Sequence, residues 1–417
     1  MNNTYNFKSN MKKILNIPLH WQILAGLALA VPFGYFFTGQ VKYVSWMGDV
    51  FLNALKMIII PLILSSLISA VTNIGAGKNL GRIGLKTLIY YVSTSLLAIV
   101  TGLFLFNIIR PGKDSDLDLI QDVSNLGLDR TSFGETIKNI IPTNIFESLS
   151  SGNILSIIFF AILFGFFITR VSDKPRIFLT DFFDSIYKVM MKLTLFVIRF
   201  TPLGVFGIVA KVVADNIDNL LSLAGSMGIY MLTVVIALII HAGLTLPLIL
   251  RFLGRSNPLK HFRNVITPLL TAFSTSSAAA TLPLTMDAVE KKSGVSNKIT
   301  SFTLPLGATI NMDGTALYEC VAAMFIAKVY GLDLGLTEQL IVVFTALLAS
   351  IGAAAIPMAG LLMITIILSA LGLPLEGVGL ILAVDRPLDM IRTATNVWSD
   401  SIGAAVIARS EGEKLKI

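Results

Sequence analysis

Long apolar segments dominate this chain. Six of them cover residues 22–37, 50–71, 87–109, 153–168, 228–250 and 339–372. Most approach or exceed the roughly 20 residues that an α-helix needs to cross the hydrocarbon core of a bilayer. Hydrophobic residues make up 54% of the sequence and charged residues only 14%, which is too little charge for the surface of a soluble protein of this size. The pattern predicts an all-α polytopic membrane protein.

Short basic clusters between the apolar segments predict the orientation of the chain. They lie at 8–13, 78–86, 170–176, 251–263, 291–298 and 409–416. Basic loops face the cytoplasm, whereas the polar stretches at 112–135, 214–219 and 330–339 have few cations or an acidic excess and are expected outside. We therefore expect both termini in the cytoplasm, a location in the plasma (inner) membrane, and about six spans before residue 251.

Charge and cysteine content exclude other classes. The net charge of +7 at pH 7 comes largely from these loops, so no nucleic-acid partner is expected. Cys320 is the only cysteine, which excludes an intramolecular disulfide. Residues 1–22 are followed by no small-residue cleavage motif and are interpreted as a cytoplasmic tail rather than as a cleavable signal.

Two segments are expected to enter and leave the membrane on the same side. Residues 264–290 lie between two basic clusters that face the cytoplasm, yet they are too few for two crossings of about 20 residues each. Residues 339–372 are apolar but interrupted, and no basic residue lies between 330 and 385. We expect eight transmembrane helices plus two re-entrant helical hairpins, one entering from each side.

The tips of the two hairpins share a sequence pattern. SSAAATLP at 276–283 and SIGAAAIP at 350–357 are each followed by polar residues within an apolar span, NMDGT at 311–315 and DMIRTATN at 389–396. Repeats of opposite orientation, with broken helices near the membrane midplane, are typical of secondary transporters. The sequence therefore predicts an inverted-repeat architecture.

Polar side chains form a stripe on the last span. If 380–408 is helical, an arc of roughly 100° holds Asp385, Asp389, Arg392, Thr393, Asn396 and Asp400. Charges at membrane depth are costly and usually functional. The set suits an amino acid with an anionic side chain: a carboxylate binds its ammonium, and a guanidinium, an amide and the free backbone N–H groups of the hairpin tips bind its carboxylates. The alternative is a static ion pair between Asp389 and Arg392, one helical turn apart.

A second interrupted span, GATINMDGTALYE, covers residues 307–319. Glycines on either side of Asn311 and Asp313 favour local unwinding, which frees backbone carbonyls beside a carboxylate. Carbonyl and carboxylate oxygens at a broken helix are ligands for a monovalent cation such as sodium. Asp400 is a second carboxylate that needs a cation, and YYVSTS at 90–95 supplies hydroxyls to the same region. The alternative is a kinked helix that Asp313 caps.

The motifs NMDGTALYE at 311–319 and LDMIRTATNVWSD at 388–400, with hairpin tips ending in TLP and IPMAG, resemble the glutamate/aspartate transporter family. This family of dicarboxylate/amino acid:cation symporters includes the excitatory amino acid transporters, and the resemblance covers essentially the whole chain. It implies a secondary active transporter, not an enzyme, that carries aspartate or glutamate with sodium. It also implies an elevator-type alternating-access mechanism and a homotrimer in the lipid membrane. The alternatives are a C4-dicarboxylate symporter and a proton-coupled glutamate symporter.

The resemblance also assigns individual residues. The substrate residues that it implies are Ser276, Ser277, Ala278, Thr315, Ala355, Ile356, Asp389, Arg392, Thr393 and Asn396. The sodium residues that it implies form three sites: Gly307, Asn311, Asn396 and Asp400; Tyr91, Thr94, Ser95, Asn311 and Asp313; and Thr309, Met312, Ser350, Ile351 and Ala353. Glu319 is a candidate proton carrier, because desolvation favours the neutral carboxyl, and a statically hydrogen-bonded glutamate is the alternative. Sodium acts as a coupling ion, and no other cofactor is implied.

The same resemblance divides the chain into a scaffold and a transport part. The scaffold comprises residues 1–85 and the fourth and fifth spans, which lie within 131–253. The same segment leads into the sixth span, which belongs to the transport part. The transport part continues with 86–130 (third span and outer loop), 254–295 (inner hairpin), 296–330 (interrupted seventh span), 331–373 (outer hairpin) and 374–417 (last span and cytoplasmic tail). Ala355 stands where many members have glycine, and Pro387 is expected to interrupt the last span.

Overall fold

The computed structural model describes residues 19–75, 81–112, 140–352 and 359–417, and every regular element in these ranges is helical. The α-helices are α2 Leu19–Phe36, α3 Ser45–Gly75, α4 Gly81–Ile109, α6 Ile145–Ser151, α7 Ile154–Ile168, α8 Asp173–Ile198, α9 Thr201–Asp215, α10 Leu220–Ile240, α11 Leu246–Phe252, α12 Pro258–Thr275, α13 Ala278–Asp287, α14 Asn297–Ile310, α15 Asp313–Val329, α16 Leu336–Gly352, α17 Ala359–Ala370 and α18 Val378–Ser410. The remaining turns are the 3₁₀ segments η1 Thr38–Tyr43, η3 Ile217–Asn219 and η6 Leu375–Gly377, and the π-helical segments η4 His241–Thr245 and η5 Ala288–Ser293. The predicted all-α class is therefore confirmed.

Several helices are suited to a bilayer. Among the described residues, Ser45–Thr72, Arg82–Ile109 and Leu220–Phe252 are each long and apolar enough to cross a membrane. Helices α8 and α9 pass the same test only together and are bent by 53° at their junction. Shorter apolar helices cover Trp21–Phe36, Ser156–Ile168 and Leu336–Ser350. The count of eight spans stays a prediction, because length and composition do not by themselves decide it.

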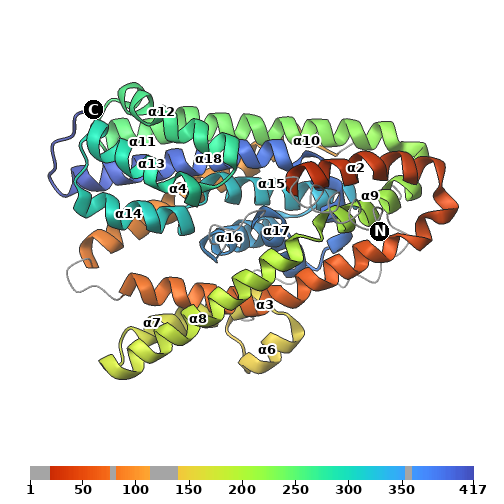
Figure 1. Ribbon diagram of the computed structural model, residues 1–417, viewed down its shortest axis with the longest axis horizontal. Helices are drawn as coiled ribbons and strands as arrows, with labels where there is room; N and C mark the ends of the chain where they lie inside the picture. The colour runs from red at the N-terminus through yellow and green to blue at the C-terminus, as the bar shows by residue number, and fades with distance from the viewer. Residues whose placement is uncertain (1–18, 76–80, 113–139, 353–358) are drawn as a thin grey trace, which may run out of the picture.

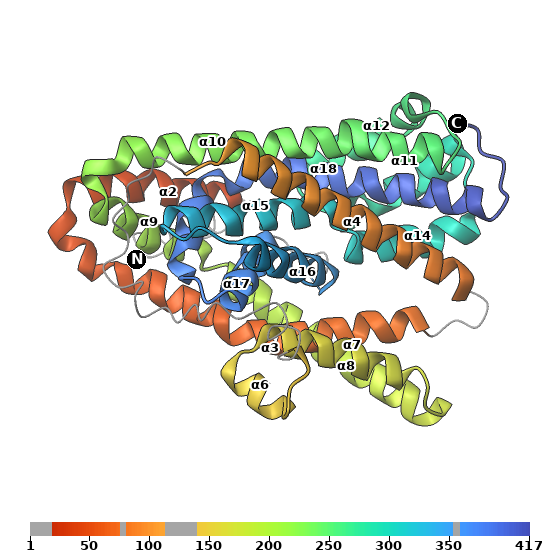
Figure 2. The ribbon, with the colours of Figure 1, turned by 180° about the vertical axis from the view of Figure 1, so that it is seen from behind.

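The helices pack into two main groups (Figures 1 and 2). In the first, α3 packs on α7, α8 and α9, and α9 also packs on α2. In the second, α15 lies between α4, α10, α16, α17 and α18. Every residue of α15 except Lys328 is buried, so its first turn is held deep inside the protein.

The two predicted breaks in the second group are present. Helix α14 ends at Ile310 and α15 begins at Asp313, so Asn311 and Met312 form the unwound junction expected from the neighbouring glycines. Helices α12 and α13 contact each other and are separated by Ser276, in the left-handed region with φ 50°, and by Ser277. Whether this pair re-enters the membrane stays a prediction, as does the matching role of α16 and α17, whose connecting residues 353–358 lie outside the described ranges.

The expectation for Pro387 was wrong. Helix α18 continues for 33 residues through this position. A proline inside a helix removes one backbone hydrogen bond and crowds the preceding turn. Packing of α18 against α10, α12, α14 and α15 outweighs this local cost, and the predicted polar stripe therefore lies on one uninterrupted helix.

The end of the chain folds back onto neighbouring helices, and Figure 1 shows the C-terminus beside α12 and α14. The backbone N–H of Lys416 donates to the Ser293 carbonyl at 3.0 Å, and that of Ser296 donates to the Glu413 carboxylate at 2.9 Å. Glu411 forms ion pairs with Lys86, at 2.6 Å, and with Arg82. These contacts connect the end of α18 to the start of α4 and to the turn before α14.

Candidate functional site

The polar stripe of α18 divides into two levels. Asp385, Asp389 and Arg392 lie together, and Asn396 and Asp400 follow at the next turns. Since a helix rises about 1.5 Å per residue, Asp400 lies roughly 12 Å beyond Arg392 along the axis. The stripe therefore serves two neighbouring sites rather than one.

Arg392 is the centre of the first site. Its side chain is only 1% exposed, and its Nη2 lies 2.9 Å from Asp389 Oδ1 and 3.1 Å from Asp385 Oδ1. The guanidinium stacks 3.8 Å from the ring centroid of Tyr318, whose hydroxyl donates to Asp385 Oδ1 at 2.8 Å. The ion pair considered from the sequence is therefore formed, and Asp385 joins it.

The ion pairs use only part of the guanidinium. Arg392 Nε and Nη1 are buried and have no hydrogen-bond partner among the described residues. A buried donor without a partner costs about 1–3 kcal/mol, and more when the group is charged. On α17, a Cβ at Gly360 would lie 2.8 Å from Nη1, so glycine allows this backbone to approach the guanidinium. The geometry leaves two charged donors for a further carboxylate.

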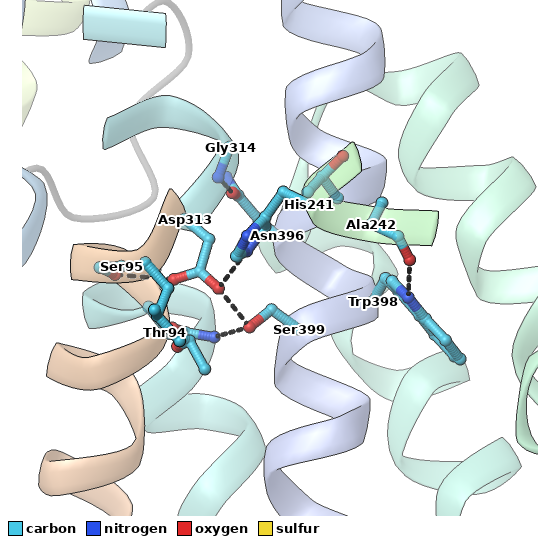
Figure 3. Close-up of polar contacts among 12 residues, drawn as sticks. Thr94, Ser95, His241, Ala242, Asp313, Gly314, Asn396, Trp398 and Ser399 are labelled. Atoms are coloured by element: carbon cyan, nitrogen blue, oxygen red, sulfur yellow. Dashed lines mark hydrogen bonds and ion pairs between the residues drawn. The ribbon is translucent and has the colours of Figure 1, made fainter. Parts of the chain in front are cut away.

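Asn396 connects the first site to the broken span (Figure 3). Its Oδ1 accepts a hydrogen bond from the Gly314 backbone at 2.8 Å, and its Nδ2 donates to Thr315 Oγ1 at 3.1 Å. The Thr393 hydroxyl donates to the Asp389 carbonyl at 2.8 Å within the helix. The predicted substrate residues of α15 and α18 therefore do lie side by side.

The second site surrounds Asp313 at the start of α15. Asp313 Oδ1 accepts from Ser95 Oγ of α4 at 2.7 Å, and Oδ2 accepts from Ser399 Oγ of α18 at 2.6 Å (Figure 3). His241 Nε2 of the π-helical segment η4 lies 3.1 Å from the same Oδ2. Met312 is the N-cap residue of α15 and Asp313 lies in its first turn, so among the described residues the Asp313 carboxylate is held by side chains of α4, α18 and η4.

Asn311 joins Asp313 to Asp400. Its Nδ2 donates to Asp400 Oδ1 at 2.8 Å and to Ser399 Oγ at 3.0 Å, and its Oδ1 accepts from Thr94 at 3.3 Å. Two carboxylates therefore share one network of neutral donors in the interior. Taking such charges out of water is costly unless a cation compensates them.

The other predicted ion residues lie in different positions. Tyr91 donates its hydroxyl to the Thr303 carbonyl at 2.7 Å. A Cβ at Gly307 would lie 2.6 Å from this hydroxyl and 2.8 Å from Asp400 Cγ, so Tyr91 and Gly307 border Asp400. Thr309 and Ser350 donate to carbonyls of their own helices, at Leu306 and Leu347. Met312 packs in the apolar core with α3 and α7. No hydrogen bond among the described residues joins the members of the third set. The side chain of Ile351 and the whole of Ala353 lie outside the described residues.

The predicted hairpin-tip residues are described only on the inner side. The Ser276 hydroxyl is buried without a hydrogen-bond partner among the described residues, and Ser277 Oγ accepts from the Ala280 backbone at 3.2 Å, at the start of the helix in which Ala278 is the first residue. Ala355 and Ile356 lie outside the described ranges.

Both carboxylate oxygens of fully buried Glu319 have no hydrogen-bond partner among the described residues, which argues against a static hydrogen bond.

His241 and Ser399 were missed from the sequence. A lone histidine in an apolar span was itself a signal, since ionisable residues at membrane depth are usually functional. Ser399 lies next to Asp400 but at the edge of the predicted arc, and only its contacts with Asn311 and Asp313 place it in the site. Tyr318 and Asp385 likewise gain their importance from their contacts with Arg392.

A buried ionic site at a broken helix inside an apolar helical bundle defines a polytopic membrane transporter. The chain belongs to the sodium:dicarboxylate symporter family, whose profile matches residues 19–410. It is 37% identical over 424 residues to human excitatory amino acid transporter 2, covering 88% of this chain and 73% of the relative. It is 35% identical over 410 residues to the proton/sodium-glutamate symport protein of Bacillus caldotenax, covering 95% of each chain. It is also 35% identical over 448 residues to mouse excitatory amino acid transporter 4, covering 91% of this chain and 79% of the relative.

These relationships confirm the family predicted from the motifs. Because the family consists of symporters, the interpretation as a membrane transporter rather than an enzyme is confirmed as well. Sodium as the coupling ion agrees with the family.

Proposed function

We propose that this chain is a sodium-coupled symporter of acidic amino acids, aspartate or glutamate. The observation that carries the proposal is the pairing of Asp389 with an Arg392 guanidinium that retains two buried donors without a partner among the described residues. The names of the relatives, excitatory amino acid transporters and a proton/sodium-glutamate symport protein, point to the same substrates.

The two charged groups account for an acidic amino acid better than for a plain dicarboxylate. Arg392 Nε and Nη1 are charged donors that suit the side-chain carboxylate. Asp389 suits the ammonium, a group that a C4-dicarboxylate lacks. We assign the α-carboxylate to the amide of Asn396, to the hydroxyls of Thr315 and Thr393, and to backbone at the hairpin tips, residues 276–278 and 355–356.

Sodium is assigned to the network of Asp313, Asn311 and Asp400. Two buried carboxylates that share neutral donors favour binding of a cation, because a cation supplies the charge that asparagine and serine cannot. We place one ion near Asp400, Gly307 and the carbonyls of Asn311 and Asn396. We place a second near Asp313, with Tyr91, Thr94, Ser95 and Asn311, and a third with Thr309, Met312, Ser350, Ile351 and Ala353. Asn396 follows Arg392 by one helical turn on α18 and hydrogen-bonds Gly314 and Thr315, the residues after Asp313, which supports coupling of ion and substrate binding.

We propose an elevator-type movement of the site-bearing helices against the remaining ones. Helices α4 and α10–α18 surround both sites, whereas α3 packs mainly on α7, α8 and α9, and α9 packs mainly on α2 and α3. This division supports the predicted scaffold and transport parts. We further propose that the chain forms a homotrimer through the scaffold and that both of its termini are cytoplasmic.

Proton-coupled glutamate symport is the second candidate. Glu319 supports it, because a fully buried carboxyl without a hydrogen-bond partner among the described residues can bind a proton at low cost. The two candidates differ in the cation whose gradient drives uptake.

The test is uptake of labelled aspartate into proteoliposomes, with an inward gradient of sodium, of protons or of neither. Excess unlabelled aspartate, glutamate, serine or succinate is then added as a competitor. We expect sodium-driven uptake that aspartate or glutamate competes for far better than serine or succinate. Passive flux without sodium would refute symport, and stronger competition by succinate would replace the amino acid with a C4-dicarboxylate. The variant Asp389→Asn is expected to lose amino-acid uptake.

A further inference from the structure

An open groove lies on the side of α18 away from the ion site. It has a volume of about 950 Å³ and lies between α10, η4 and α11 on one wall and α12 on the other, with α18 as its floor. We call it the α12 groove. Its lining is mostly apolar, and Leu259, Leu270 and Phe273 of α12 are 71%, 61% and 41% exposed. Soluble proteins rarely expose so much apolar surface in one place, which indicates contact with acyl chains.

The two ends of the α12 groove differ in chemistry. Arg251 and Asn257 lie at one end, next to the loop that joins α11 to α12. Ile239 and Phe273 lie at the other end, about 20 Å away at 1.5 Å per helical residue. Because one leaflet of the hydrocarbon core is roughly 15 Å thick, the groove is long enough for one acyl chain.

The charged end coincides with the end of a membrane-crossing segment. Leu220–Phe252 is one of the stretches long and apolar enough to cross, and Arg251 is its penultimate residue. Arg251 is exposed and forms no ion pair with a carboxylate among the described residues. Arg255 and Lys260 add positive charge to the same loop and helix start. Basic pockets between membrane helices at the cytoplasmic side bind anionic lipid headgroups.

We propose that the α12 groove binds an anionic phospholipid. The phosphate group pairs with Arg251, and an acyl chain lies along Phe262, Ile266 and Leu270 of α12. Its end reaches the floor formed by Ala394, Thr395 and Trp398 of α18. The lipid is thus a ligand distinct from the transported amino acid and its coupling ions.

Trp398 connects the groove to the ion site. Its indole N–H donates to the Ala242 carbonyl of η4 at 3.0 Å, and its ring packs on Phe262 (Figure 3 shows the first contact). The next residue, Ser399, lies about 100° further around the helix and donates to Asp313. Trp398 is 5% exposed and lines the groove, so a quencher that enters the groove lies close to its ring.

The test uses quenching of Trp398 fluorescence by brominated lipids. The chain has 3 tryptophans, and replacing exposed Trp21 and Trp46 by phenylalanine leaves Trp398 alone. The purified protein is reconstituted in phosphatidylcholine with rising fractions of brominated phosphatidylglycerol or of brominated phosphatidylcholine with the same chains. We expect half-maximal quenching by the anionic lipid at an about fivefold lower fraction, the effect of one basic residue on an anionic lipid.

Variants separate the groove from general surface charge. Arg251→Gln is expected to make the two quenching curves coincide, and Arg251→Lys to keep them apart. Lys298→Gln, which removes an exposed cation of α14 outside the groove, is the matched control and is expected to keep them apart as well. Three results would each overturn the proposal. They are coincident quenching curves in the protein with Arg251 intact, no quenching by either lipid, and a loss of the separation between the curves in Lys298→Gln equal to that in Arg251→Gln. The measurement needs neither sodium nor amino acid, so its failure is independent of the transport function.

Discussion

Gly307→Ala offers a direct test of the ion site around Asp400. A Cβ at this position would lie 2.6 Å from the Tyr91 hydroxyl and 2.8 Å from Asp400 Cγ, and closer still to Asp400 Oδ1. Because carbon atoms pack at about 3.5–4.0 Å, the carboxylate has to move by roughly 0.7 Å or more. The hydrogen bond from Asn311 to Asp400, now 2.8 Å, is then stretched to the limit of hydrogen bonding.

The expected effect is a selective loss of sodium affinity. One contact to a charged group contributes about 1.5–3 kcal/mol, which corresponds to a roughly 10- to 100-fold higher sodium concentration for half-maximal binding. The assay is a sodium titration of the melting temperature of the purified protein, since a ligand that binds the folded state raises it. The same titration of sodium-driven aspartate uptake provides the second readout.

Gly228→Ala in α10 is the matched control, because a Cβ there meets nothing within 4 Å. Overpacking alone costs about 1–3 kcal/mol, so a second variant, Asp400→Asn, removes the charge without adding volume. We expect both site variants to shift the sodium midpoint and Gly228→Ala to leave it in place. An unchanged midpoint in Gly307→Ala and in Asp400→Asn would refute the assignment of Asp400 to a sodium site.

Three further predictions concern other parts of the chain. Arg392→Gln is expected to weaken the competition of unlabelled aspartate in the uptake assay at least 100-fold, because two charged contacts to the side-chain carboxylate are lost. The competition of serine should change little, and an equal loss for both competitors would contradict this role of Arg392. Ser399→Ala is expected to weaken sodium binding about tenfold in the melting assay, since Asp313 loses its 2.6 Å donor; no change would make Ser399 a bystander. Ion pairs with Lys86 and Arg82 lower the pKa of Glu411 below its ordinary 4.5. Their stabilisation is therefore present above about pH 4.5 and is lost as the pH falls through the lowered pKa. Glu411→Gln should lower the melting temperature slightly at pH 7, and the difference in melting temperature between the variant and the unaltered protein should shrink below pH 4.5. Equal melting curves at pH 7 would show that the ion pairs contribute nothing.

Much of the candidate site followed from local sequence. The period of a helix places Asp389, Arg392 and Asn396 on one face, and the helix α18 has that face. Glycines beside Asn311 and Asp313 favoured an unwound junction, and α14 and α15 are separated there. Both inferences depend on residues close in sequence, where a single rule of backbone geometry suffices.

The sequence by itself therefore determined the helical class, the apolar segments, the broken span and the polar stripe, because each is a periodicity or a run within one segment. Only the tertiary structure decided that the stripe serves two sites, that His241 and Ser399 contact Asp313, and that α18 continues through Pro387. Those outcomes depend on which helices pack together, and packing joins residues such as His241 and Asp313 that are 72 positions apart. No local pattern encodes such a distance, since it results from the burial of whole helix faces at once.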